Sequence, residues 1–300
     1  MVIGWRPIIK QLALFELGFR PFFLLACLFS IIAALLWMAS YTFGWALPVT
    51  DVSAIAWHGH EMVFGYSTAI IAGFLLTAVP KWTGVPTISD LPLSLLALMW
   101  LLARTLALSN SPLLFEWAAF FDILFLFGLA LAVIYPVVKA KQWQQTAIIS
   151  KVILLLAANI LYYLGAFHIV DQGISWGLFS GVYIIMALIF TMARRVMPFF
   201  IERGVGYDVK LKNWSIIDSG SLIFLTALWI SDVFFKQVLL TALFSLALAM
   251  LHSVRLWGWH TRGIWKKPLL WVLFLGYSMF ILGFVLTALN FFTLYASTIP

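Results

Sequence analysis

The stretch that decides the fold is WHGHEMVFGYSTAIIAGFLLTAVPKWTG, from Trp57 to Gly84. It begins with two histidines, a glutamate and a methionine, and then continues as a long apolar run. A helix that crosses a bilayer needs about 20 such residues, so the run predicts a transmembrane span. Charged residues make up 10% of the chain, and only 5 of its residues are histidine. A concentration of polar side chains at one end of a span therefore points to function.

The composition extends this prediction to the whole chain. Of its 300 residues, 64% are hydrophobic, and the mean hydropathy is +1.06. Soluble domains are closer to half apolar and a quarter charged. The apolar runs are continuous and lack the alternation of barrel strands, so we expect an all-α, polytopic transmembrane bundle embedded in lipid.

About nine apolar runs are long enough to span a bilayer, and we expect them to form one transmembrane domain over residues 1–300. Lysine and arginine are concentrated before the first run and in the even-numbered loops, which predicts a cytoplasmic N-terminus. The net charge of +7 therefore reflects membrane topology, and no nucleic-acid partner is expected. The predicted spans are 21–43, 60–80, 91–108, 113–136, 147–169, 175–193, 215–235, 237–256 and 268–292.

His58 and His60 lie at the predicted outer end of the second span. Two positions on an α-helix differ by about 200° around the axis, so the two rings would point in opposite directions. Either only one ring faces the bundle, or this segment enters the membrane unwound. Glu61 follows His58 by three residues, so on a helix it would share the face of His58 and could orient that imidazole.

His168 is predicted at the same leaflet, because the fifth span ends there. Three imidazoles at one depth, those of His58, His60 and His168, could ligate haem iron or copper. The alternative is that they are interfacial or helix-end histidines without a ligand. His252 lies about 24 Å deeper and cannot share an iron with His58, so we expect it to be a packed side chain.

Charged residues inside spans are costly and usually pair with one another. Arg104 ends the third span, and Glu116 and Asp122 lie in the fourth, across the SNSP turn. The three could form a structural staple, or they could anchor a haem propionate or relay protons. Arg195, with Pro198, falls where we expect the sixth span to stop.

These motifs resemble the NnrS family of bacterial membrane proteins. The resemblance rests on H-x-H-E-M-x-F-G followed by G-F-L-L-T-A-x-P-x-W-T-G, on FELGFRPFFLLA, and on FDILFLF and RRVMPFF. The residues that match the longest motif are His58, His60, Glu61, Met62, Phe64, Gly65, Gly73 to Ala78, Pro80, Trp82, Thr83 and Gly84. Arg104, Asp122 and Arg195 match the polar positions of the other stretches. The family normally has about twelve spans, so the chain is expected to be a C-terminally shortened member.

The resemblance implies a haem- and copper-associated protein of the bacterial inner membrane. Its expected role is nitric oxide metabolism and protection against nitrosative stress, with nitric oxide as a ligand. It implies His58 and His60 as metal ligands, and leaves open whether nitric oxide is bound, reduced or kept from other proteins. The alternatives are a proton-coupled transporter or permease, or a non-catalytic sensor or assembly subunit.

Overall fold

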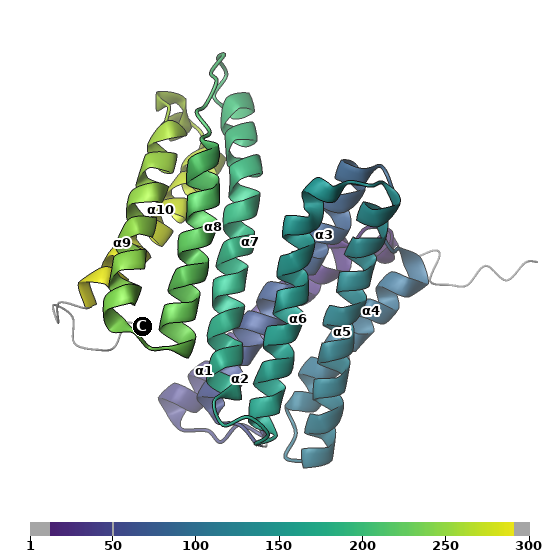
Figure 1. The fold of residues 1–300 in the computed structure, drawn as a ribbon. Coiled ribbons are helices and arrows are strands. Elements are labelled where there is room, and N and C mark those ends of the chain that lie inside the picture. Colours follow the sequence, from purple (N-terminus) through teal and green to yellow (C-terminus); the bar gives the residue numbers. More distant parts are fainter. Residues whose placement is uncertain (1–12, 50, 291–300) are drawn as a thin grey trace, which may run out of the picture. The chain divides into compact units, whose positions relative to one another are not determined.

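The computed structural model describes residues 13–49 and 51–290 (Figure 1). Within these ranges the chain is helical without strands, and nine helices are long and apolar enough to cross a membrane. The predicted all-α polytopic fold is confirmed, whereas the cytoplasmic N-terminus stays a prediction. The α-helices are α1 (Phe19–Phe43), α2 (Ala54–His60), α3 (Thr68–Thr83), α4 (Asp90–Ala107), α5 (Pro112–Lys139), α6 (Thr146–Ala166), α7 (Gly173–Gly204), α8 (Ser215–Trp229), α9 (Val238–Gly258) and α10 (Pro268–Asn290).

Short helices of other types join these elements. In the described part of the chain, two are π-helices, η3 (Glu61–Ser67) and η5 (Ile230–Phe234). Three others there are 3-10 helices, η2 (Ala13–Phe15), η4 (Trp143–Gln145) and η6 (Arg262–Lys266). Because η3 is continuous with α2 and α3, residues Trp57–Thr83 of the histidine motif lie on one membrane-spanning segment of 30 residues, Ala54–Thr83.

The expected helix stop near Pro198 is wrong, because α7 continues to Gly204. Proline removes one backbone donor but does not prevent the next turns from forming their own bonds. The amide of Val205 still donates to the carbonyl of Ile201 at 3.1 Å. Arg195 therefore lies inside the helix, and not at its end.

The contacts divide the chain into two compact units, Met1–Ile185 and Met186–Pro300, with the boundary inside α7. The prediction of one domain over the whole chain stays a prediction. In the first unit α3 packs against α1 and α5, and α5 also packs against α4 and α6. Helices α3 and α5 therefore form the centre of this unit and carry many of its fully buried side chains.

Close packing between α6 and α7 depends on small residues. A Cβ at Gly177 would lie 2.6 Å from the backbone nitrogen of Tyr162, closer than packed atoms approach. Glycine at this position lets the two helix backbones touch, as in many membrane helix pairs. Gly173, four residues before Gly177, faces the α6 backbone in the same way, since a Cβ there would lie 2.6 Å from the backbone nitrogen of Gly165.

In the second unit α9 packs against α8 on one side and α10 on the other. Many large apolar side chains of both units are exposed, including those along the outer faces of α1, α4 and α9. In a water-soluble protein such faces would promote aggregation, but a bilayer solvates them.

Candidate functional site

The motif at the end of α2 folds as a π-helix, and this places its polar residues. The wider π turn interrupts the regular ladder of backbone bonds, and such turns occur frequently at functional sites. The carbonyl of Gly65 accepts a hydrogen bond from the indole of Trp100 at 3.0 Å. The side chains of Ser67 and Thr68 donate to other carbonyls of the turn. The irregular backbone is thus satisfied from within the protein, as lipid surroundings require.

His60 is buried at the junction of α2 and η3, with both ring nitrogens facing oxygen atoms. Its Nε2 lies 3.0 Å from Oδ1 of Asn159 and 3.3 Å from Oδ2 of Asp122. Its Nδ1 lies 3.4 Å from Oε1 of Glu61. The ring stacks on Tyr162 with the centroids 4.2 Å apart. The doubly protonated imidazolium satisfies this arrangement in full, because both nitrogens then donate.

Arg104 connects the two carboxylates that flank His60. Its Nη2 lies 2.5 Å from Oδ1 of Asp122, and its Nη1 lies 3.1 Å from Oε2 of Glu61. All three side chains are at most 2% exposed. Asp122 also accepts hydrogen bonds from Asn159 at 2.9 Å and from Tyr163 at 3.2 Å. Charges this deeply buried persist only when they are paired and bonded, so the group forms one interdependent network.

We call this group the His60 network: His60, Glu61, Arg104, Asp122, Asn159 and Tyr163. It draws on four segments of the first unit, α2 with η3, α4, α5 and α6. The pairing of Arg104 with Asp122 follows the sequence prediction. The sequence predicts that Glu61 shares the face of His58, but its carboxylate lies beside Arg104 and His60. A guanidinium attracts a carboxylate more strongly than a neutral imidazole does.

His58 points away from the network, as the spacing on a helix predicts. Its ring stacks on Trp37 of α1, with the centroids 4.4 Å apart and the planes 14° from parallel. Its Nδ1 is buried and has no hydrogen-bond partner among the described residues. The motif therefore carries one histidine that is fully bonded and one that offers a free ring nitrogen.

The other predicted site residues lie elsewhere. His168 is exposed in the turn after α6, where its φ is 59°. Glu116 is exposed on α5 and forms no ion pair within residues 13–49 and 51–290, while Arg195 is exposed on α7. Across the same ranges, no group of three or more His, Cys, Asp or Glu side chains could hold a metal ion. Ligation of one metal by His58, His60 and His168 together stays a prediction. The structure does not bring these three side chains together as a metal-binding group.

A second polar network occupies the second unit, around His252. The hydroxyl of Tyr277 lies 2.6 Å from Nδ1 of His252 and accepts from Arg255 at 3.2 Å. Arg255 also donates to Asp218 at 2.8 Å, and Arg194 lies 2.7 Å from the same carboxylate. Since the Tyr277 oxygen accepts from Arg255, its own proton goes to Nδ1 of His252. The proton of neutral His252 then sits on Nε2, which is buried without a partner in the described chain.

Sequence reasoning missed Asn159, Tyr163 and the whole second network except His252. Asn159 gave a signal, because an amide in the middle of the apolar run ILLLAANILYY needs a hydrogen-bond partner in lipid. Asp218 and Arg255 lie 37 positions apart in the chain, and only the packing of α8 against α9 brings them together.

Comparison with known proteins identifies the family of the chain. The family model described as NnrS protein matches residues 13–299. The chain belongs to the NnrS family. No curated protein and no solved structure matches it. In this NnrS chain the motif that carried the resemblance coincides with the His60 network, and the nine apolar helices make it a multi-pass membrane protein.

Proposed function

We propose that this NnrS-family protein acts in nitric oxide metabolism and in protection against nitrosative stress at the bacterial inner membrane. The observation that carries the proposal is the free, buried Nδ1 of His58, which precedes His60 by two residues in the segment that resembles the family motif. Family membership supports the role in the nitric oxide response, and haem and copper are the groups that the family implies.

The donor chemistry of the described residues fits one imidazole ligand better than three. His60 has both nitrogens committed to Asn159, Asp122 and Glu61. His58 has a nitrogen to offer, and haem iron is often held by a single histidine. Bound haem or copper would supply redox chemistry and a binding point for nitric oxide.

The protein's own residues would orient that ligand and fix the segment that carries it. Stacking on Trp37 limits rotation of the His58 ring. The ion pairs of Arg104 with Glu61 and Asp122 hold the adjacent π-helix in place. His60, two residues after His58, holds a proton at Nε2 between Asn159 and Asp122 and so ties the end of α2 to α5 and α6.

The test is the haem and copper content of the detergent-purified protein. We expect a Soret absorption band or bound copper in the wild type, and at least a tenfold weaker affinity for the metal group in His58→Ala. His260→Ala is the control, because His260 is exposed in the loop after α9 and should leave the content unchanged. A wild-type protein without either group would contradict the proposal. A loss in His168→Ala equal to that in His58→Ala would favour the three-imidazole site.

A further inference from the structure

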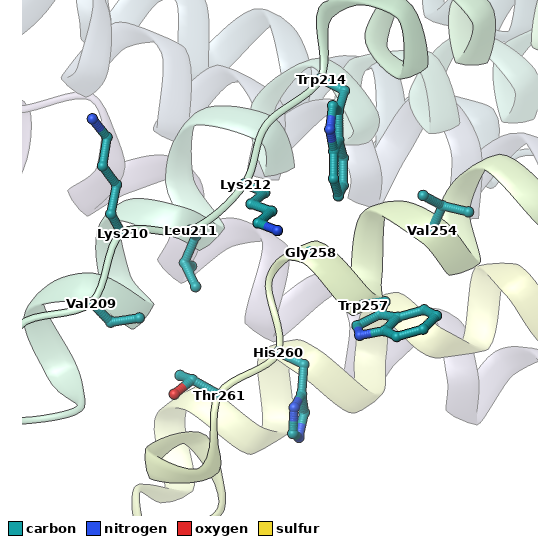
Figure 2. Close-up of a pocket in the computed structure, with 10 residues that line it drawn as sticks. All are labelled: Val209, Lys210, Leu211, Lys212, Trp214, Val254, Trp257, Gly258, His260 and Thr261. Carbon is teal, nitrogen blue, oxygen red and sulfur yellow. The ribbon is translucent and has the colours of Figure 1, made fainter.

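A basic pocket lies in the second unit, and none of the residues that line it belongs to either histidine network. Its volume is about 430 Å³, and its walls are the linker between α7 and α8 and the C-terminal end of α9. Lys210 and Lys212 come from the linker, and Trp257, His260 and Thr261 from the α9 side. Figure 2 shows Lys212 extended toward α9, whereas Lys210 points away from it.

Hydrogen bonds fix the walls of this pocket. The amide of Lys212 donates to the carbonyl of Gly258 at 3.2 Å, which ties the linker to the end of α9. The amide of Gly263 donates to the hydroxyl of Tyr207 at 3.0 Å, and the indole of Trp259 donates to Asn213 at 2.9 Å. A site held by such bonds loses little conformational entropy when a ligand binds.

The net charge around the pocket is positive. Segments 207–214 and 257–267 contain five basic residues and one acidic residue, Asp208, and one further carboxylate, that of Glu202, accepts a hydrogen bond from the amide of Leu211 at 2.9 Å. The ammonium groups of Lys210 and Lys212 form no hydrogen bond or ion pair with any described residue. The Nε2 of His260 accepts a hydrogen bond from Trp265 at 3.2 Å, so the proton of the neutral ring lies on Nδ1 as a further donor. An anion bound in the pocket could accept hydrogen bonds from these lysine and histidine donors.

An apolar track runs from the pocket along α9. Its residues recur every three or four positions, so they share one face of the helix. They are exposed by 43–82%: Leu243, Leu246, Met250, Val254 and Trp257. Val254 and Trp257 belong both to this face and to the pocket lining. A phosphate bound near Lys212 would therefore have an apolar surface beside it, as the headgroup and acyl chain of a phospholipid require.

We infer that this pocket binds the phosphate headgroup of an anionic phospholipid, with the acyl chain lying along the exposed face of α9. The positive-inside rule predicts that this rim is cytoplasmic, and basic pockets between membrane helices on that side bind such headgroups. Exposed tryptophans such as Trp257 and Trp214 are typical of the same interfacial depth. The pocket needs neither metal nor nitric oxide chemistry, so its test is independent of the proposed function.

The experiment measures the binding of phosphatidylglycerol and phosphatidylcholine to the delipidated full chain by native mass spectrometry. The test variant is Lys210→Gln/Lys212→Gln. The control is Lys81→Gln/Lys139→Gln, which removes the same charge from exposed lysines of the first unit. Each lysine near an anionic headgroup contributes on the order of a fivefold change in affinity, so we expect the test variant to bind phosphatidylglycerol at least about fivefold more weakly, which is the contribution of Lys212. The control should match the wild type, and phosphatidylcholine should bind weakly to all three.

Inorganic phosphate and glycerol phosphate are the competitors that separate a lipid from a free anion. Neither should displace phosphatidylglycerol at millimolar concentration, because neither has an acyl chain to cover α9. Displacement by either one would show a free-anion site and overturn the inference. Equal losses in the test and control variants, or no preference for phosphatidylglycerol in the wild type, would also overturn it.

Discussion

His60 in the first unit and His252 in the second are both buried, and each lies in a network with a tyrosine, an arginine and an aspartate. In the first unit two carboxylates surround one guanidinium, and both nitrogens of His60 face oxygen atoms. In the second unit two guanidinium groups surround one carboxylate, and His252 bonds only through Nδ1. The imidazolium form of His60 would balance the first network, whereas the second already holds excess positive charge. The ratio of carboxylates to guanidinium groups thus favours the charged imidazole at His60 and the neutral imidazole at His252, although the two histidines have similar neighbours.

The largest effect should come from removing one carboxylate from each network. Asp122→Asn leaves the buried Arg104 and His60 with Glu61 as their one carboxylate partner among the described residues, and we expect it to lower the free energy of unfolding by about 3–5 kcal/mol. Asp218→Asn should cost about 1–3 kcal/mol, because Arg194 is 53% exposed and can turn to solvent, and the buried Arg255 keeps the hydroxyl of Tyr277 as an acceptor. Denaturant unfolding in detergent micelles measures both. Equal losses would remove the distinction between the networks.

Replacing the two histidines sharpens the same comparison. His60→Phe leaves Oδ1 of Asn159 without its donor and removes one of the partners of Asp122, and we expect a loss of about 2–3 kcal/mol of unfolding free energy. His252→Phe removes an Nε2 that has no partner, and although the proton of Tyr277 loses its acceptor Nδ1, the Tyr277 oxygen keeps its bond from Arg255, so we expect a smaller loss of about 1 kcal/mol. Thermal unfolding of the two variants side by side is the measurement. The reverse order would contradict the hydrogen-bond assignment.

The π-helix should tolerate no side chain at Gly65. A Cβ there would lie 2.7 Å from Nη1 of Arg104 and 2.7 Å from Oε2 of Glu61. We expect Gly65→Ala to lower the free energy of unfolding by about 1–2 kcal/mol through this crowding. Gly276→Ala is the matched control, because nothing lies within 4 Å of the added atom and alanine favours a helix. A neutral Gly65→Ala would mean that the ion pairs are looser than the geometry indicates.

The smallest effect should be that of Glu116→Gln. Glu116 is exposed on α5 and pairs with no described residue, so we expect a change within about 0.5 kcal/mol of unfolding free energy. The same unfolding assay used for Asp122→Asn detects any difference. A loss of several kcal/mol would place Glu116 in the His60 network and contradict its position on the surface.

The sequence predicted the helices well because apolar runs of membrane length have few alternative structures. The predicted span 91–108 and α4 (Asp90–Ala107) differ by one residue at each end. The opposite directions of His58 and His60 also followed, since they depend only on helix geometry. The extension of α7 past Pro198 did not follow, because a proline lowers the probability of a helix without excluding it.

The charged residues of the site could be predicted from the sequence, but the contacts that each of them makes were harder to predict. Arg104 and Asp122 were candidates because charges are rare inside spans, and their pairing follows from the short turn between α4 and α5. Asn159 joins them from α6 through packing that no local pattern encodes. The π-helix at Glu61 likewise depends on partners such as Trp100, which lies 35 positions away from Gly65.

A double-mutant cycle on Arg104 and Asp122 tests the central claim, that the charges of the NnrS motif form one buried network with these residues. The cycle compares Arg104→Gln, Asp122→Asn and the double variant by their free energies of unfolding. We predict a coupling energy of about 2 kcal/mol or more, because each single variant leaves the other charge buried and poorly paired. Losses that add within about 0.5 kcal/mol would show that the two side chains act independently, and would contradict the account.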